Sequence, residues 1–157
     1  MIAVGDSIPA VNLTLVTADG DEVRSADAVF AGKKVVLFAL PGAFTPTCSR
    51  AHLPGFVVNA DTIKAKGVDM IACLSVNDAF VMRTWGEQQN AEALTLLADG
   101  GGAFTRALGL EMDTGDFGGL RSQRYAMIVE DGTVTHLNVE QPKSFEVSSA
   151  EAVLALL

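Results

Sequence analysis

The sequence predicts an α/β fold in which helices flank a central, mixed β-sheet. Short apolar segments rich in β-branched residues, typical of buried strands, alternate with longer segments of helical character. Near the end of the chain, the pair Asp131-Gly132 separates two further strand-like segments, which is a strong signal for a β-hairpin. The alternation indicates parallel strands covered on both faces, and the hairpin adds antiparallel strands to the same sheet.

The elements follow from this pattern in order. The expected strands cover residues 34–40, 68–75, 94–98, 125–130 and 133–139. The expected helices cover residues 46–66, 78–90, 103–108 and 150–157, the last of them opened by a capping box at residues 148–151. Within the first helix, Pro54 has no N–H to donate to the carbonyl of Arg50, which predicts a kink or a weak first segment. The resulting order, β-α-β-α-β-α-β-β-α, is shared by thioredoxin-like folds and by other α/β sandwiches.

Length and composition define the class of protein. With 157 residues the chain has the size of one ordinary domain, so we expect a single domain over residues 1–157. Hydrophobic residues make up 49% and charged residues 19%, which excludes a disordered chain. No apolar run approaches the roughly 20 residues that cross a bilayer, and we expect no secretory signal. The net charge of −8 argues against binding to nucleic acids or anionic membranes.

One of the two cysteines stands where α/β proteins usually place their chemistry. Two cysteines cannot build a secreted scaffold with several disulfides, so we expect a cytoplasmic protein with reduced thiols. Cys48 follows the first expected strand and a short turn, in which Thr45 is a good N-cap and Pro46 a good first helical residue. Cys48 is then in the first helical turn, where free backbone N–H groups and the helix dipole stabilise a thiolate.

The helix terminus alone is too weak to make this cysteine reactive. Lowering a cysteine pKa by two units from about 8.5 requires roughly 2.7 kcal/mol of preference for the thiolate. A helix terminus supplies about 0.3–1 kcal/mol, or up to ~2 kcal/mol where it is partly buried. Arg50 would point away from Cys48, and His52 shares its helix face but is only partly charged at neutral pH. An arginine brought in by the fold is therefore required, and spacing does not identify which one.

Structural explanations of the same residues stay open at this point. A free cysteine is often a small buried hydrophobe, and the helix position supports that role for Cys48 as well as a reactive one. Cys73, inside an apolar strand, is expected to be inert core packing, and the sequence does not decide whether the two cysteines pair. The cysteines and histidines lack the paired spacing of zinc ligands, so neither a metal nor a cofactor is expected. The remaining candidates are expected to be packing or surface residues: Trp85, Tyr125 and His136.

Three long segments of the chain resemble a known family. The pattern Pro41-x-x-x-Thr45-x-x-Cys48 is similar to the active-site motif of peroxiredoxins, which are thiol peroxidases with a thioredoxin-like fold. Three segments resemble the type-5 subfamily: PGAFTPTCSRAHLPGF at 41–56, VDMIACLSVNDAFVMRTWG at 68–86 and RYAMIVEDGTVTHLNVE at 124–140. These segments keep the family's order and span nearly the whole chain. The resemblance therefore implies a thioredoxin-like sandwich and peroxidase activity.

The resemblance also implies roles for individual residues. Cys48 matches the peroxidatic cysteine, whose thiolate attacks hydrogen peroxide or an alkyl hydroperoxide and becomes a sulfenic acid. Thr45 would hydrogen-bond the peroxide and the sulfur, and Pro41 would shield the sulfur from water. Arg124 matches the arginine that stabilises the thiolate and polarises the peroxide, and His52 matches the polar partner that orients it. Without the resemblance, Thr45 is a plain N-cap, Arg124 a surface arginine and His52 a solvated histidine.

Partners and electron donors follow from the same resemblance. Phe44 and Phe117 would line the mouth of the substrate pocket and contact a second subunit, because the family implies a homodimer. Many type-5 relatives carry a resolving cysteine near the C-terminus, whereas residues 146–151 contain none. The chain therefore resembles a one-cysteine enzyme that an external thiol re-reduces, either glutathione with glutaredoxin or thioredoxin. Two alternatives stay open: a redox sensor without peroxidase turnover, and a chaperone-like interaction module on the same fold.

Overall fold

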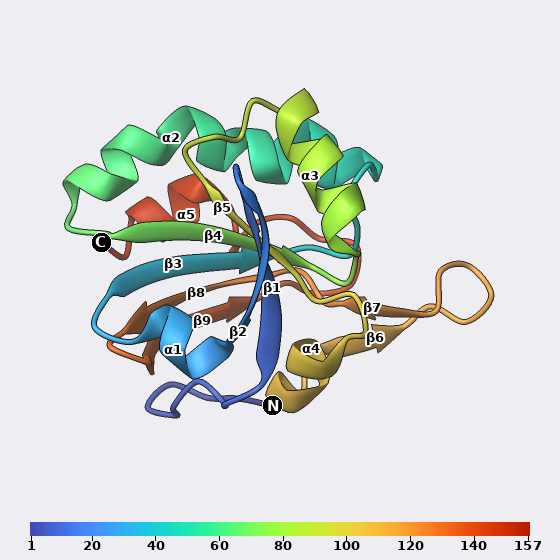
Figure 1. The fold of residues 1–157 in the computed structure, drawn as a ribbon. Coiled ribbons are helices and arrows are strands. Elements are labelled where there is room, and N and C mark those ends of the chain that lie inside the picture. The colour runs from blue at the N-terminus through green and yellow to red at the C-terminus, as the bar shows by residue number, and fades with distance from the viewer.

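A seven-stranded mixed β-sheet forms the centre of the computed structural model, which describes residues 1–157 (Figure 1). Across the sheet the strands follow the order β2-β1-β5-β4-β3-β8-β9. Their bounds are β1 (Asn12–Thr17), β2 (Gly20–Ser25), β3 (Lys34–Ala39), β4 (Met70–Ser75), β5 (Thr95–Ala98), β8 (Tyr125–Glu130) and β9 (Thr133–Val139). Two short strands, β6 (Glu111–Asp113) and β7 (Leu120–Ser122), form a separate hairpin that projects from the rest of the molecule (Figure 1).

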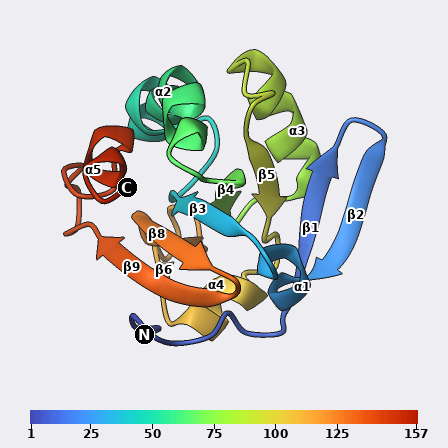
Figure 2. The same cartoon turned by 90° about the vertical axis from the view of Figure 1, so that its left-hand side faces the viewer.

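Helices cover both faces of the sheet (Figure 2). One face carries α2 (Leu53–Ala65), α3 (Ala79–Gln88) and α5 (Ala150–Leu154), and the other carries α1 (Ala26–Phe30) and α4 (Ala103–Leu108). Alternate residues of β3 enter different cores. Val36 and Phe38 belong to a cluster of 22 buried residues under the first set of helices, whereas Val35 and Leu37 belong to a cluster of 18 under the second. This three-layer arrangement confirms the predicted thioredoxin-like α/β sandwich.

The predicted strand directions are confirmed. β3, β4 and β5 run parallel, and β8 pairs with β3 in the antiparallel direction. The turn between β8 and β9 consists of Asp131 and Gly132, with φ values of 46° and 77°. Positive φ at both central residues is the geometry that Asp-Gly favours in a tight hairpin. The apolar pattern does not reveal the β1–β2 hairpin, α1 or the β6–β7 hairpin; β2, for example, is an almost fully exposed edge strand.

The first predicted helix differs from expectation in the turn that carries the cysteine. Cys48–His52 form a π-helical turn, η1, which leads into α2. The N–H of Leu53 donates to the carbonyl of Cys48, five residues back rather than four. Pro54 gives a reason for this wider turn, because in a regular α-helix its ring would clash with the carbonyl of Arg50. The irregularity predicted near Pro54 is therefore a π-helical turn.

The last helix is shorter than predicted and is capped by a different serine. α5 ends at Leu154, and its N-cap is Ser149, whose Oγ accepts a hydrogen bond from the N–H of Ala152 at 3.1 Å. The predicted cap, Ser148, instead donates its hydroxyl to the carboxylate of Glu140 at 2.7 Å. The capping-box prediction is wrong by one residue because this buried carboxylate takes the hydroxyl first expected at the helix.

The large aromatic residues of the core confirm their predicted packing role. Trp85 and Tyr125 are both fully buried. Trp85 also donates its indole N–H to Oγ of Ser49 at 3.0 Å, which ties α3 to the π-helical turn. Among the helices, none is both long and apolar enough to cross a membrane.

Candidate active site

The antiparallel pairing of β3 and β8 places Cys48 and Arg124 beside each other. Ala39, the last residue of β3, lies opposite Tyr125, the first residue of β8. The segment that follows β3 carries Cys48, and Arg124 immediately precedes β8, so both residues lie at the same end of this antiparallel strand pair. Two residues 76 positions apart in the chain are thereby in direct contact.

Arg124 uses both arms of its guanidinium group. Nη2 donates to Sγ of Cys48 at 3.1 Å, and Nη1 donates to Nδ1 of His52 at 2.8 Å. Cys48 is only 1% exposed, so little water competes with the guanidinium for the sulfur. A positive charge at this distance favours the ionised, nucleophilic form of a thiol. The structure thus brings together three of the residues singled out from the sequence.

His52 is held as a neutral imidazole with one defined tautomer. Burial, and then the charge of Arg124, lowers the pKa of His52 from 6.5 to about 3. Nε2 lies 2.9 Å from the carbonyl oxygen of Ser148, which can only accept a hydrogen bond, so Nε2 carries the proton and Nδ1 accepts from Arg124. The ring packs among three aromatic rings at centroid distances of 5.0–5.8 Å: Phe38, Phe56 and Phe145. His52 therefore directs the guanidinium without adding a charge.

Thr45 lies in the loop that joins β3 to the π-helical turn. Its carbonyl accepts a hydrogen bond from the N–H of Ser49 at 2.9 Å, as expected for the residue before a helix. Its hydroxyl does not cap the helix, however: it accepts no backbone N–H, and Oγ1 instead donates to the carbonyl of Gly42 at 2.6 Å and closes the loop on itself. With its proton committed in this way, Oγ1 is left as a hydrogen-bond acceptor.

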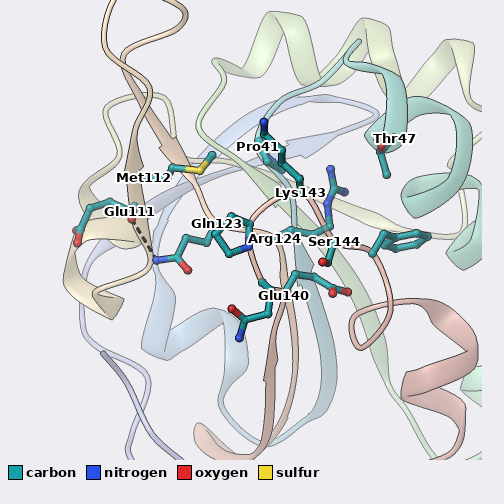
Figure 3. Close-up of a pocket in the computed structure, with 12 residues that line it drawn as sticks. Pro41, Thr47, Glu111, Met112, Gln123, Arg124, Glu140, Lys143 and Ser144 are labelled. Atoms are coloured by element: carbon teal, nitrogen blue, oxygen red, sulfur yellow. Dashed lines mark hydrogen bonds between the residues drawn. The ribbon is translucent and has the colours of Figure 1, made fainter.

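A cavity of about 600 Å³ opens beside Arg124 (Figure 3). Residues of β6 and of segment 140–145 line it together with Pro41, Thr47, Gln123 and Arg124, and Cys48 is reached from it through its contact with Arg124. A volume of this size suits a small organic molecule. Phe44 and Phe117 are outside this lining. They are 50% and 84% exposed, and Phe117 lies in the loop of the projecting β6–β7 hairpin.

Cys73 lies in the same core as Cys48 but in a different setting. It belongs to β4 and is fully buried. Burial, with a smaller contribution from Cys48, raises the pKa of the Cys73 thiol well above its ordinary value. Both cysteines are free thiols in the structure.

Two charged residues that sequence reasoning missed support the site. Glu140 follows β9, and its N–H donates to the carbonyl of Arg124 at 2.9 Å. Burial opposes ionisation of Glu140, but hydrogen bonds from residues 146–148 outweigh it and hold the pKa of this carboxyl below its usual value. Arg121 donates from Nη1 to the carbonyl of Pro41 at 3.2 Å and so fixes the loop before Cys48. No local pattern separates either residue from an ordinary surface charge.

Arg121 also packs against a glycine of the active-site motif. A Cβ atom added at Gly42 would lie 2.3 Å from Nη1 of Arg121. A side chain at position 42 would therefore displace the end of the flexible arginine side chain that contacts the carbonyl of Pro41.

The chain is similar to known proteins over nearly its whole length. Residues 3–154 match the family model Redoxin. Peroxiredoxin-2E-2, chloroplastic, of Oryza sativa subsp. japonica is 51% identical over 164 residues, which cover 99% of this chain and 72% of the relative. Reduced Prx3 in complex with H₂O₂ from Vibrio vulnificus superposes with a TM-score of 0.97 at 65% identity, over 99% of both chains. Peroxiredoxin 5 from Alvinella pompejana superposes with a TM-score of 0.85 at 36% identity, over 99% of this chain and 97% of that one.

His52 should make the stability of the protein depend on pH below neutrality. The unfolded chain protonates this histidine near pH 6.5, whereas the folded protein keeps it neutral down to about pH 3. Between these values the unfolded state binds more protons, so the free energy of unfolding should fall as pH falls, by about 2 kcal/mol between pH 7 and pH 5. Urea unfolding of the wild type and of His52→Gln across this interval measures the difference.

In His52→Gln this share of the pH dependence should disappear. His136→Gln is the matched comparison, because it removes the other imidazole of the chain. A His52→Gln protein that loses stability toward pH 5 as steeply as the wild type would contradict the buried neutral state.

Proposed function

The chain belongs to the Redoxin family and is a peroxiredoxin, a thiol peroxidase, and we propose that it reduces hydrogen peroxide and alkyl hydroperoxides at Cys48. The observation behind this proposal is the 3.1 Å contact between Nη2 of Arg124 and Sγ of Cys48. It joins a nucleophile to a cation that favours its ionised form, beside a cavity that a substrate can enter. The V. vulnificus relative, whose structure contains H₂O₂, supports hydrogen peroxide as one substrate.

In the proposed step, the thiolate of Cys48 attacks one oxygen of the peroxide. An S–O bond forms and the O–O bond breaks, and its electron pair leaves with the second oxygen, which takes a proton and departs as water or an alcohol. Sulfur loses two electrons and becomes a sulfenic acid, and the peroxide gains them. No metal or organic cofactor enters this balance.

Two side chains are placed to assist this step. Arg124 is a fixed cation next to the sulfur, so it can stabilise the negative charge that grows on the leaving oxygen without reorganising. Thr45 donates its own proton to Gly42, so its Oγ1 can accept a hydrogen bond from the hydroxyl end of an incoming peroxide, whose oxygen is the one that the sulfur attacks. Pro41 lines the cavity and limits the approach of water to Cys48.

A one-cysteine cycle is supported by the position of the second thiol. Cys73 is fully buried within β4, and its raised pKa keeps it protonated, which makes it a poor nucleophile. Residues 146–151 contain no cysteine. We therefore propose that the sulfenic acid condenses with an external thiol, which releases water and forms a mixed disulfide. A second thiol then reduces that disulfide and restores Cys48.

Glutathione with glutaredoxin is the reductant that the cavity favours over thioredoxin. Cys48 is 1% exposed, and the cavity beside Arg124 has the volume of a small organic molecule, so a tripeptide can be held next to the site without a folded protein having to reach the sulfur. Lys143 and Arg124 offer cations to its carboxylates, and Glu111 offers an anion to its amino group. The proposal places the protein in a reducing compartment, where such a thiol pool is present.

A homodimer is supported by exposed aromatic side chains near the loop that joins β3 to the π-helical turn. Phe44 and Phe117 are 50% and 84% exposed. Arg121 lies 5.5 Å from the ring centroid of Phe117 and also contacts the carbonyl of Pro41, so Phe117 is close to the loop that carries Phe44. Clustered exposed aromatic residues of this kind are typical of protein–protein interfaces.

Stopped-flow mixing of the reduced protein with hydrogen peroxide tests the reaction. Cys48→Ser should abolish rapid oxidation, because it removes the nucleophile. Arg124→Lys should slow oxidation roughly 100-fold, because a lysine ammonium cannot donate to Sγ of Cys48 and to Nδ1 of His52 in the geometry of the planar guanidinium. Cys73→Ser is the matched control and should react within about twofold of the wild type. Equal peroxide consumption by the wild type and Cys48→Ser would refute the proposed role of Cys48, and oxidation without turnover would favour a redox sensor.

Steady-state peroxide consumption with different reductants tests the electron donor. Glutathione with glutaredoxin should sustain turnover, and thioredoxin with its reductase should sustain less at equal thiol concentration. Intact-mass analysis during turnover should detect a glutathione adduct on Cys48, which Cys73→Ser retains. Efficient turnover with thioredoxin alone, or a Cys48–Cys73 disulfide in place of the adduct, would contradict the proposed cycle.

Sedimentation velocity of the reduced protein tests the homodimer. The wild type should sediment as a dimer, and Phe117→Asp should shift it toward the monomer by placing a charge in the apolar contact. Val58→Asp is the matched control, because Val58 is 81% exposed and belongs to α2 rather than to the loop of Phe44 or the β6–β7 hairpin of Phe117. A wild type that is monomeric at all concentrations would rule the dimer out.

A further inference from the structure

We propose that Glu140 is a positioning residue for the peroxidase reaction, which holds Arg124 against Cys48 by way of Ser148 and His52. Glu140 does not touch the sulfur, and no ion pair joins its carboxylate to the guanidinium of Arg124. Its influence passes through backbone groups of the segment before α5. The inference rests on the proposed role of Cys48.

The carboxylate of Glu140 gathers an unusual number of donors. Oε2 accepts hydrogen bonds from the N–H groups of Glu146, Val147 and Ser148, each at 2.8 Å, and from Oγ of Ser148 at 2.7 Å. Oε1 accepts a further bond from the N–H of Glu146 at 3.0 Å. Glu140 is itself only 8% exposed. Three consecutive backbone N–H groups directed at one buried carboxylate fix the conformation of this segment.

The fixed segment presents one carbonyl to the active site. Because Glu140 occupies the N–H and the hydroxyl of Ser148, the carbonyl of Ser148 has a defined direction, and it accepts a hydrogen bond from Nε2–H of His52 at 2.9 Å. That bond forces Nδ1 of His52 to be the acceptor for Nη1 of Arg124. The second arm of the same planar guanidinium then reaches Cys48.

Without the carboxylate of Glu140, nothing fixes the segment whose carbonyl orients His52 and, through it, Arg124. The segment 146–148 would have several unpaired donors and would relax toward water. The Ser148 carbonyl would then no longer select the tautomer of His52, and a proton on Nδ1 would face the N–H of Arg124. The guanidinium would turn, and the sulfur would lose the cation that favours its ionised form.

A second explanation, in which Glu140 acts as a charge, predicts the opposite change. The carboxylate is close enough to raise the pKa of His52, although burial and Arg124 dominate. Removing a negative charge near Cys48 would make the site more positive and therefore favour the thiolate. Slower oxidation after the loss of Glu140 thus distinguishes positioning from a simple effect of charge.

The test compares Glu140→Ala and Glu140→Gln with Glu146→Ala in the full chain. Glu146→Ala is the matched control, because it removes an exposed carboxylate from the same segment but keeps the N–H that Glu140 accepts. Two readouts are taken: the rate of oxidation by hydrogen peroxide as a function of pH, and the ¹⁵N NMR signature of the His52 tautomer in the reduced protein. We expect Glu140→Ala to slow oxidation by roughly 10- to 100-fold near pH 7 and to shift the pH midpoint upward.

The two readouts should change together. Glu140→Gln keeps an acceptor oxygen for Ser148, so it should retain most of the rate and the Nε2-protonated signature, and it also serves if Glu140→Ala does not fold. In a His52→Gln background, Glu140→Ala should add less than about twofold, because both changes break one chain of contacts. A reduced rate with an unchanged His52 signature, or equal losses in both backgrounds, would overturn the inference.

The same experiment separates this inference from the proposed function. If wild-type Cys48 does not react rapidly with peroxide, the proposed role of Cys48 fails. The NMR signature needs no peroxide, so it still shows whether Glu140 controls the tautomer of His52. If the wild type reacts rapidly and Glu140→Ala matches it in rate and signature, only the positioning role is refuted.

Discussion

The contact between one guanidinium and one sulfur is the interaction on which the rest of the site depends. A helix terminus supplies less than the roughly 2.7 kcal/mol that would ionise a cysteine two pH units below its ordinary range. Arg124 supplies a full charge at 3.1 Å and a second donor for His52. The fold delivers it by pairing β3 with β8 in opposite directions, so that the end of one strand meets the start of the other. The sheet topology is therefore a condition for the chemistry as well as for stability.

Local signals account for much of what the sequence predicts correctly. The parallel strands were marked by apolar runs, the hairpin by Asp131-Gly132, and the reactive turn by Pro46 and Cys48 after a buried strand. The choice of Arg124 needed the family resemblance, because nothing nearby in the chain identifies it. Phe44 and Phe117 are exposed and lie outside the lining of the cavity beside Arg124, and their role at the pocket mouth and at a subunit contact stays a prediction.

The sequence does not predict that Glu140 lies beside Arg124, and the reason is geometric. A regular hairpin closed by Asp131 and Gly132 would place Val139 opposite Arg124. A β-bulge at Thr135 shifts the pairing by one residue, so that Tyr125 pairs with Val139 and the backbone of Glu140 reaches Arg124. The same carboxylate takes the hydroxyl of Ser148, which is why the capping box was assigned one residue too early. Both errors come from long-range contacts that local patterns cannot contain.

The π-helical turn fixes how many residues separate Cys48 from α2. Such a turn holds one more residue than a regular helical turn, and here it contains both Cys48 and His52, which contact two arms of one guanidinium. Deleting one residue from the turn would restore regular bonding, because the turn already absorbs the extra residue and the segments on either side would keep their register. The ring of Pro54 would then meet a carbonyl four residues before it, which is the clash that the wider turn avoids. Homologues that are one residue shorter within 48–53 should therefore also lack the proline.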